Sequence, residues 1–258
     1  MKIVDSFIFY NELDLLEFRL ELLNDIVDKF VLVESTKTFV GKKKPLFYKE
    51  NEKRYSKYLN KIHHVIVDNL DSENVWINET TQRNGIHKGL EKLKLVDGDL
   101  IIISDADEII DPKTLFNLKK NNSVKSIMNL VQDLYYYNIT CKFDGDWKMS
   151  KIMDYKTYKT KPIPQQIRQT AGKDVPNGGW HFSYFGDVNF IKNKIMNFSH
   201  QEYNNEIYYN EDHLIDVIKH GKDLFRRQDQ NINFKLIDPK NNNYLPEGYK
   251  KLLKFKQI

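Results

Sequence analysis

The chain of 258 residues is poor in cysteine, proline and glycine, of which it has 1, 7 and 11 residues. The single cysteine, Cys141, excludes an internal disulfide and a structural zinc site built from several Cys and His ligands. No apolar run approaches the roughly 18 residues of a membrane-spanning helix, and the first residues lack the segments of a signal peptide. We therefore expect no transmembrane segment and a cytoplasmic location.

The chain also lacks a strong excess of either charge. Its 40 Lys and Arg side chains and 36 Asp and Glu side chains give a formal net charge of +4. This balance falls short of the basic surface of a nucleic-acid-binding protein, so we expect no nucleic-acid partner. Hydrophobic residues make up 40% and charged residues 29% of the chain, which is typical of a compact globular protein.

Apolar segments with strand and helix periodicity alternate in the first half of the chain. The expected strands are residues 2–9, 30–33, 62–67 and 100–103, and the expected helices are residues 12–23, 76–95 and 112–118. In the first helix, Arg19 stands with the charged residues between the leucines of the apolar face. This alternation predicts a doubly wound α/β fold whose mainly parallel sheet binds ligands at the carboxyl ends of its strands.

The second half is predicted to be irregular and aromatic-rich. Its features are an aromatic cluster at 135–137, a Pro- and Gly-rich loop region at 162–179, a strand at 180–185 and a helix from about 206 to 221. No repeat or long linker interrupts the sequence, so we expect one continuous domain. The basic and apolar tail at 250–256 favours a closing helix, and the alternative is a helix lying on an acidic membrane surface.

Two acidic residues, Asp105 and Asp107, follow directly after the most apolar of the expected strands. Two carboxylates one residue apart can bind a hard divalent cation, and such a cation can bridge the oxygens of a nucleotide diphosphate. The alternative is a structural turn, because Asp also caps free backbone N–H groups. The isoleucine-rich strand before the pair favours metal binding.

Other polar residues are expected at the same edge of the sheet. Tyr10, Asn11 and Glu12 follow the first strand, and Glu34 follows the second. Arg83 and Asn84 lie on the expected helix before the strand that leads to Asp105. In a sugar-nucleotide site, such groups hold the base and ribose, and Arg83 would neutralise diphosphate charge together with the Lys42–Lys44 loop. The alternatives are a favourable acid in a first helical turn for Glu12 and a solvated helix residue for Arg83.

Six short motifs follow one another along the chain. They are residues 9–20 (FYNELDLLEFRL), 33–35 (VES), 38–42 (TFVGK), 82–84 (QRN), 104–109 (SDADEI) and 178–183 (GGWHFS). Together they resemble glycosyltransferase family 17, the family of the β-1,4-mannosyl-glycoprotein β-1,4-N-acetylglucosaminyltransferases. The similarity runs from about residue 1 to residue 230.

The resemblance implies a GT-A fold and inverting transfer of a sugar, with UDP-GlcNAc or a related UDP-sugar as donor and a glycan or polysaccharide as acceptor. It also implies a divalent metal, Mn²⁺ or Mg²⁺, and places it and the diphosphate at Asp105 and Asp107. Within a single domain of residues 1–258, we expect residues 1–120 to bind the nucleotide sugar and residues 121–258 to bind the acceptor.

The transfer also needs a base that takes the proton of the acceptor hydroxyl. The sequence offers several candidates and does not rank them: Glu108, Asp144, Asp146, His181, Glu202, Glu211 and Asp212. His181 is of most interest, because the adjacent Gly178 and Gly179 permit close backbone approach and Trp180 can stack on a sugar. His181 is alternatively a third metal ligand, or a hydrogen-bonded histidine in a strand.

Two other kinds of protein remain as alternatives. A non-catalytic carbohydrate-binding module would account for the aromatic residues but would leave Arg83 and the acidic pair without a role. A metal-dependent phosphohydrolase with an aspartyl nucleophile also has two acids after an apolar strand. In such enzymes the pair lies near the N-terminus, whereas here it begins at residue 105.

Overall fold

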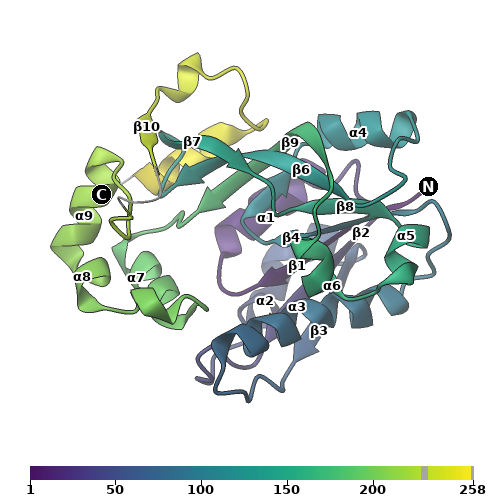
Figure 1. Cartoon of the computed structure of the whole chain (residues 1–258), viewed down its shortest axis with the longest axis horizontal. Helices are drawn as coiled ribbons and strands as arrows, with labels where there is room; N and C mark the ends of the chain where they lie inside the picture. The colour runs from purple at the N-terminus through teal and green to yellow at the C-terminus, as the bar shows by residue number, and fades with distance from the viewer. Residues whose placement is uncertain (228–231, 257–258) are drawn as a thin grey trace. The chain divides into compact units, whose positions relative to one another are not determined.

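A computed structural model describes residues 1–227 and 232–256 of the chain, which divides into two compact units (Figure 1). Unit 1 consists of Met1–Gln132 and Lys148–Gly179, and unit 2 of Asp133–Trp147 and Trp180–Ile258. Strands β6 (Met128–Tyr136) and β9 (Lys173–Ser183) begin in unit 1 and end in unit 2. The organisation as one domain with halves divided at residue 120 stays a prediction.

Unit 1 holds the alternating strands and helices expected from the sequence, together with several further elements. In chain order, besides parts of β6 and β9, they are β1 (Ile3–Phe9), α1 (Leu13–Leu23), β2 (Lys29–Ser35), α2 (Phe47–Glu50), the 3₁₀ helix η1 (Glu52–Tyr58), β3 (Ile62–Val67), α3 (Val75–Glu91), β4 (Leu100–Asp105), β5 (Glu108–Ile110), α4 (Pro112–Lys120), β8 (Lys151–Asp154), α5 (Tyr155–Thr160) and α6 (Pro164–Gln169).

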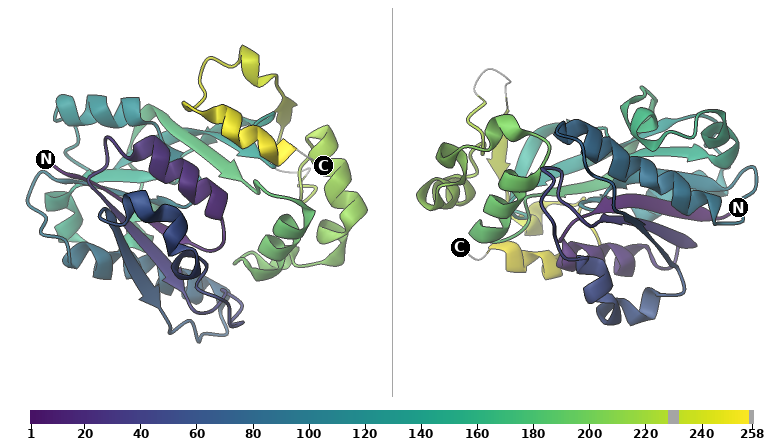
Figure 2. Two further views of the ribbon diagram at one scale, coloured as in Figure 1. Left: turned by 180° about the vertical axis from the view of Figure 1, so that it is seen from behind. Right: turned by 90° about the horizontal axis from the view of Figure 1, so that it is seen from below.

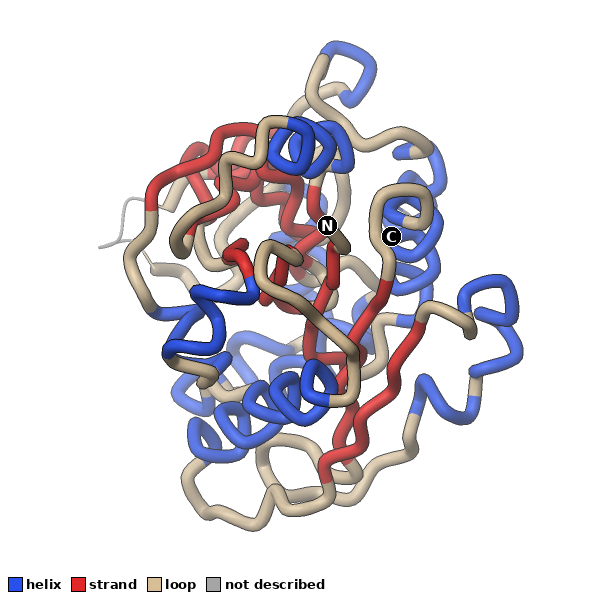
Figure 3. Tube along the Cα trace, turned by 90° about the vertical axis from the view of Figure 1, so that its right-hand side faces the viewer, coloured by secondary structure: helices blue, strands red, loops and turns tan. Residues whose placement is uncertain are grey.

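The sheet of unit 1 is mainly parallel. Its strands lie in the order β8-β4-β1-β2-β3, in which β4, β1, β2 and β3 are parallel and β8 is antiparallel to β4. Helices flank these strands (Figure 3). The α/β prediction is confirmed, and the architecture is compatible with a GT-A fold.

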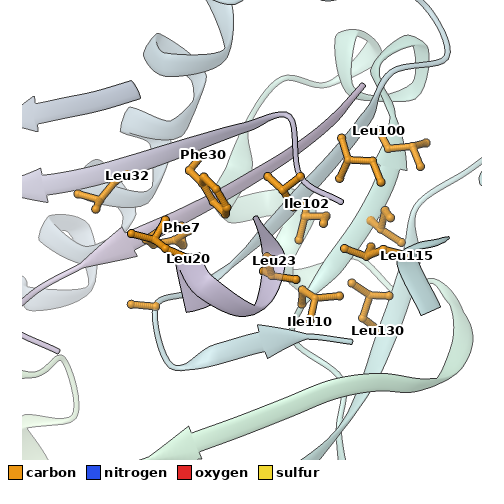
Figure 4. Packing of buried hydrophobic residues seen from close by; sticks show 14 of the residues in the cluster. Phe7, Leu20, Leu23, Phe30, Leu32, Leu100, Ile102, Ile110, Leu115 and Leu130 are labelled. Atoms are coloured by element: carbon orange, nitrogen blue, oxygen red, sulfur yellow. The ribbon is translucent and has the colours of Figure 1, made fainter. Parts of the chain in front are cut away.

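Side chains of each strand alternate between the two faces of this sheet, and each face has its own helices. On one face, Phe7 and Leu32 pack with Leu20 of α1 in a large apolar cluster, part of which Figure 4 shows. On the other face, Val31 packs with Ile86 of α3. Figure 2 shows α1 (purple) and α3 (blue) on opposite sides of the strands.

Two glycines bring α3 very close to the sheet. A Cβ atom added at Gly85 would lie 2.9 Å from Val33, and one at Gly89 would lie 2.4 Å from Val31. The absence of side chains at these two positions therefore seats α3 against β2, and this close packing fixes the residues of α3 that face the carboxyl ends of the strands.

Unit 2 has a separate aromatic core. Besides the ends of β6 and β9, it contains β7 (Cys141–Trp147), α7 (Val188–Asn197), η2 (Gln201–Tyr203), α8 (Glu206–Tyr209), α9 (Glu211–His220), β10 (Phe234–Leu236), η4 (Pro239–Asn241) and η5 (Tyr249–Lys256). Tyr136, Tyr137 and Phe225 are buried in its core cluster. Burial also raises the pKa of the Cys141 thiol to about 12, which is the behaviour of an unreactive core cysteine.

Three local predictions were wrong, each for a physical reason. The expected helix from 206 to 221 is broken at Asn210, whose side chain accepts hydrogen bonds from Asp212 and His213 and starts α9 afresh. The loop region at 162–179 contains α6, which begins at Pro164, a residue suited to the first helical turn. Arg19 is wholly buried, because an acidic partner lies inside the sheet.

The C-terminal tail is a 3₁₀ helix, η5, whose apolar residues pack within unit 2. Leu252 is buried, and the ring of Phe255 lies 5.5 Å from the ring of Phe185. These contacts favour the closing helix over the membrane-bound alternative. Across the described ranges 1–227 and 232–256, no helix has the length and apolar character needed to span a bilayer.

Candidate active site

Three strand ends of unit 1 meet at one edge of its sheet. In the register of the strands, Ile8 of β1 pairs with Asp105 of β4, and Phe9 of β1 pairs with Glu34 of β2. Tyr10 follows β1 directly. The residues predicted from the first, second and fourth strand ends therefore lie at a common carboxyl edge, where parallel sheets bind their ligands.

The turn after β4 carries the acidic pair. Asp105 ends β4, residues 106–107 form the turn, and Glu108 begins β5. The side chain of Asp105 is 28% exposed, whereas residue Asp107 is 5% exposed and Glu108 is fully buried. The turn thus brings three carboxyl side chains with different solvent access into four consecutive positions.

Arg19 of α1 fastens this turn from the α1 face of the sheet. Its guanidinium forms a buried ion pair with Asp5 of β1, with a shortest distance of 2.6 Å. Its Nη1 atom donates to the backbone carbonyls of Asp105 at 2.9 Å and Glu108 at 2.7 Å, and its Nη2 atom donates to Ser104 Oγ at 2.6 Å. One buried arginine therefore holds both ends of the turn.

Two further arginines hold the carboxylate of Asp105 from the α3 face. Arg83 Nη1 of α3 donates to Oδ1, and Arg168 Nη2 of α6 donates to Oδ2 at 2.7 Å. Arg83 also donates to Glu79 Oε1 at 2.6 Å and Gln165 Oε1 at 2.6 Å. Both oxygens of Asp105 therefore accept a guanidinium N–H, and the carboxylate has a fixed orientation.

Glu108 is bound on both of its oxygens. Arg168 donates from Nη1 to Oε2 and from Nη2 to Oε1, each at 2.7 Å, which is a two-point contact. Oε2 also accepts from Ser150 Oγ at 2.8 Å and from the backbone N–H of Asp105 at 2.9 Å. Burial lowers the pKa of Arg168, but the charges of Asp105 and Glu108 outweigh it and raise that pKa above its ordinary value.

The Gln82-Arg83-Asn84 motif of α3 joins several elements at this edge. Gln82 Nε2 donates to the carbonyls of Phe9 at 3.1 Å and Val33 at 3.0 Å, and thereby ties the ends of β1 and β2 together. Asn84 Oδ1 accepts from the backbone N–H of Gln165 at 3.1 Å and anchors α6. In this structure, the three residues of the motif connect the strand ends, the acidic turn and α6.

A second polar cluster lies beside the ends of β1 and β2. Glu34 is fully buried and accepts from the backbone N–H of Tyr48 at 3.0 Å and contacts His64 Nε2 at 3.1 Å. The ammonium of Lys44 lies 3.9 Å from Glu34 and 5.4 Å from the ring centre of Tyr10. Burial lowers the pKa of Lys44, and the nearby charge of Glu34 opposes this.

The residues between β1 and α1 are held by hydrogen bonds within the turn and by ring packing. The carboxylate of Glu12 accepts from the backbone N–H groups of Tyr10 at 3.2 Å and Asn11 at 3.1 Å. These bonds fix the turn between β1 and α1. Tyr10 packs edge-on against Phe47, with ring centres 5.7 Å apart, beside Lys44.

The donor set of the turn after β4 fits a divalent cation of the kind that also binds a nucleotide. Mg²⁺ is commonly held by one or two carboxylates, with substrate phosphates and water completing its shell. Asp105 and Asp107 supply oxygens of this type, and each oxygen of Asp105 has a second lone pair beside the one that accepts an arginine N–H. In the part of the chain that the structure describes, no three or more His, Cys, Asp and Glu side chains gather into a metal site of their own.

The remaining predicted residues belong to unit 2. His181 of β9 is 8% exposed, and its ring lies 4.6 Å from the ring of Trp147. Trp180 is buried and donates from Nε1 to the carbonyl of Tyr244 at 3.2 Å, which is a core contact rather than an open sugar platform. Asp212 is exposed in the first turn of α9.

Sequence reasoning did not find two arginines of the site, Arg19 and Arg168. For Arg19, a signal existed: Asp5 interrupts an apolar strand, and Arg19 lies between Phe18 and Leu20 in the following helix. An acid and a base that each interrupt an apolar segment favour a buried pair. For Arg168, the only local signal is Pro164, which is typical of a helix start.

The sequence of the chain is similar to known proteins. The model of glycosyltransferase family 17 matches residues 1–245. The β-1,4-mannosyl-glycoprotein 4-β-N-acetylglucosaminyltransferases of Rattus norvegicus and Homo sapiens are each 30% identical to the chain over an alignment of 115 residues that covers 42% of this chain. The match covers 21% of the rat protein and 22% of the human protein, so it reaches about a fifth of the length of these relatives.

Proposed function

Because the chain belongs to glycosyltransferase family 17, we propose that it transfers N-acetylglucosamine from UDP-N-acetylglucosamine to a hydroxyl of a glycan or polysaccharide. The acceptor oxygen attacks the anomeric carbon as the bond to UDP breaks, so the configuration inverts. The observation that carries the proposal is the acidic turn of Asp105 and Asp107 at the carboxyl end of β4, in which two arginines hold the carboxylate of Asp105.

We propose that Mn²⁺ or Mg²⁺ binds with the donor and is held by Asp105 and Asp107. When bound, the cation would supply positive charge to the departing diphosphate. The chain's own contribution is the orientation of the two carboxylates. Arg19 holds the backbone of the turn, and Arg83 holds one oxygen of Asp105.

The second polar cluster supports a nucleotide site beside the acidic turn. Tyr10 and Phe47 offer aromatic surface, and Lys44 lies 5.4 Å from both of their ring centres. An aromatic ring can stack on a base, and a buried ammonium with a carboxylate neighbour can bind an anionic or carbonyl group of the nucleotide. We propose that Tyr10, Asn11 and Lys44 contact the donor, while Glu34 and Glu12 hold the backbone around them.

The candidate bases differ in their hydrogen bonds and in their exposure to solvent. Both oxygens of Glu108 accept from buried donors, which supports a positioning role rather than proton removal from an acceptor. His181 offers an imidazole nitrogen as a proton acceptor, and Asp212 is a carboxylate exposed to solvent. We propose His181 as the base, with Asp212 as the alternative.

Binding and turnover together test this function. Thermal unfolding is measured with UDP alone, Mn²⁺ alone and both, followed by release of UDP from UDP-N-acetylglucosamine with a panel of glycan acceptors. Joint stabilisation by about 2.7 kcal/mol is expected when the free ligand is 100 times its dissociation constant. For the site variants Asp105→Asn and Asp107→Asn, the matched control is Asp97→Asn, because Asp97 is an exposed residue paired with Lys159 outside the site.

The outcomes separate the alternatives. A carbohydrate-binding module would be stabilised by glycans but by neither UDP nor Mn²⁺, and it would release no UDP. A phosphohydrolase would cleave UDP or simple phosphate esters without an acceptor dependence. Acceptor-dependent UDP release with retention of the anomeric configuration would contradict the inverting mechanism.

A further inference from the structure

We propose that Arg168 is a positioning residue, which acts on the donor and its cation only through the carboxylate of Asp105. The inference rests on the proposed function. The side chain of Arg168 is 6% exposed, and both of its Nη atoms donate to carboxylates. A guanidinium so placed has its charge directed at protein groups instead of at a ligand.

The geometry makes Arg168 a bridge between the two ends of the acidic turn. Its Nη2 atom donates to Asp105 Oδ2 and to Glu108 Oε1, both at 2.7 Å. Glu108 in turn accepts the backbone N–H of Asp105 at 2.9 Å. The side chain and the backbone of Asp105 are therefore held through the same Arg168–Glu108 pair.

The helix that carries Arg168 is itself fixed to α3. Gln165 lies three positions before Arg168 on α6, so the two side chains share a helix face. Gln165 accepts from Arg83 Nε at 2.6 Å, and Arg83 holds the other oxygen of Asp105. Helix α6 thus couples both arginines, and the plane of the Asp105 carboxylate is set from two sides.

Only an arginine can make this arrangement. The planar fork of a guanidinium contacts both oxygens of Glu108 and still reaches Asp105, whereas the ammonium of a lysine is a single donor point. Arg168→Lys retains the positive charge and most of the buried volume but loses the fork. This variant therefore separates orientation from charge.

The test compares Arg168→Lys with Arg227→Lys, which alters a half-buried arginine of unit 2 that pairs with Asp223. Mutation of a residue that hydrogen-bonds to a metal ligand commonly lowers metal affinity or activity by about 10–100-fold. We expect a loss of that size in kcat and in Mn²⁺ affinity measured with UDP present. Hydrogen–deuterium exchange of residues 104–109 should rise in Arg168→Lys alone. At saturating Mn²⁺, the KM for the donor should change little.

A double-mutant cycle tests whether Arg168 acts through Asp105. In an Asp105→Asn background, Arg168→Lys should weaken Mn²⁺–UDP binding no further, because the oriented carboxylate is already lost. If Arg168→Lys does not fold, Glu108→Gln serves instead, since it removes one of the two charged acceptors of Arg168 at nearly constant volume. The same losses are expected from it.

Several results would overturn the proposal. One is wild-type kcat and Mn²⁺ affinity in a folded Arg168→Lys protein that has lost only thermal stability, and another is full additivity in the cycle. A wild-type protein that binds Mn²⁺ and UDP but transfers no sugar would refute the proposed function, and weaker binding in Arg168→Lys would then still support the positioning role. A wild-type protein that binds neither refutes both.

Discussion

Asp5 of β1 and Arg19 of α1 form an ion pair in which neither side chain is exposed to solvent. Arg19 Nε donates to Asp5 Oδ2 at 2.8 Å and Nη2 donates to Oδ1 at 2.6 Å, so the contact has two points. Because the same guanidinium also binds backbone carbonyls of the turn after β4, this pair joins the first strand of the sheet to the acidic turn.

Replacing Arg19 should destabilise the fold strongly. Arg19→Met leaves the buried carboxylate of Asp5 without its partner, and removal of one member of a buried pair commonly costs about 3–5 kcal/mol. Urea unfolding followed by circular dichroism measures the change. Arg54→Met is the control, because Arg54 forms an exposed pair with Glu17 at 2.5 Å and should lose about 1 kcal/mol or less. Equal losses in the two variants would contradict the role of Arg19.

The acidic pair should control turnover more than stability. We expect Asp105→Asn and Asp107→Asn each to reduce sugar transfer by about 100-fold or more, the scale at which electrostatic groups of an active site act. Asp97→Asn should retain wild-type transfer, since its salt bridge with Lys159 is exposed. UDP release and thermal unfolding are measured side by side. Full transfer in either site variant would refute the metal assignment.

Most of the fold that positions the site followed from apolar periodicity. The strands at β1, β3 and β4 and the helix α1 were predicted within a few residues, because their buried side chains recur with strand or helix spacing. The strand β6 was not predicted as a strand, and α6 was taken as loop. Their residues pair or pack with partners far away in the sequence, and the local sequence pattern does not indicate such partners.

The candidate site shows the same limit. Asp105 and Asp107 could be found because they follow an apolar strand, and the family was confirmed by its match to residues 1–245. The burial of Arg83, which is 1% exposed, could not be predicted from the local sequence, since it depends on contacts with Gln165 and Asp105. The metal, the donor, the assigned roles of the site residues and the cytoplasmic location stay predictions.

As pH rises, UDP binding should weaken at a lower pH than it would if Lys44 had the pKa of an ordinary lysine. Burial lowers the pKa of Lys44 below 10.5, so its charge is lost within the window between that lowered pKa and 10.5. A hydrogen bond to a charged group contributes about 1.5–3 kcal/mol, so loss of the charge should weaken UDP binding by about tenfold or more. Calorimetric titration in Mg²⁺ across the alkaline range measures this.

Two comparisons sharpen this pH test. Lys44→Arg should keep its affinity over the same range, because a guanidinium stays protonated. In the same window the unfolded chain binds more protons at residue 44 than the folded chain, so the free energy of unfolding of the wild type should rise with pH relative to Lys44→Met. A pH profile of UDP affinity shared by wild type and Lys44→Arg would exclude Lys44 as the responsible group.

Removal of His181 should affect turnover more than donor binding if its imidazole takes the acceptor proton. We expect His181→Ala to lower kcat by about 100-fold, within the range of general-base catalysis, with little change in UDP affinity. His220→Ala is the control, because His220 is exposed and contacts Asp216 at 2.9 Å. Parallel losses of Mn²⁺ affinity and kcat would make His181 a metal ligand instead.

The glycines of the GGWHFS segment should be required for packing rather than for ligand approach. Gly179 has a φ of +133°, and a Cβ atom there would lie 2.1 Å from the carbonyl oxygen of Ile109. Gly179→Ala therefore adds a backbone collision to the strain of this conformation and should cost about 3 kcal/mol or more in unfolding free energy. Gly98→Ala isolates the strain, because Gly98 has a φ of +93° with no neighbouring atom within 4 Å, and about 1 kcal/mol is expected. Similar losses in both variants, measured by urea unfolding, would show that the approach of β9 to β5 tolerates a side chain.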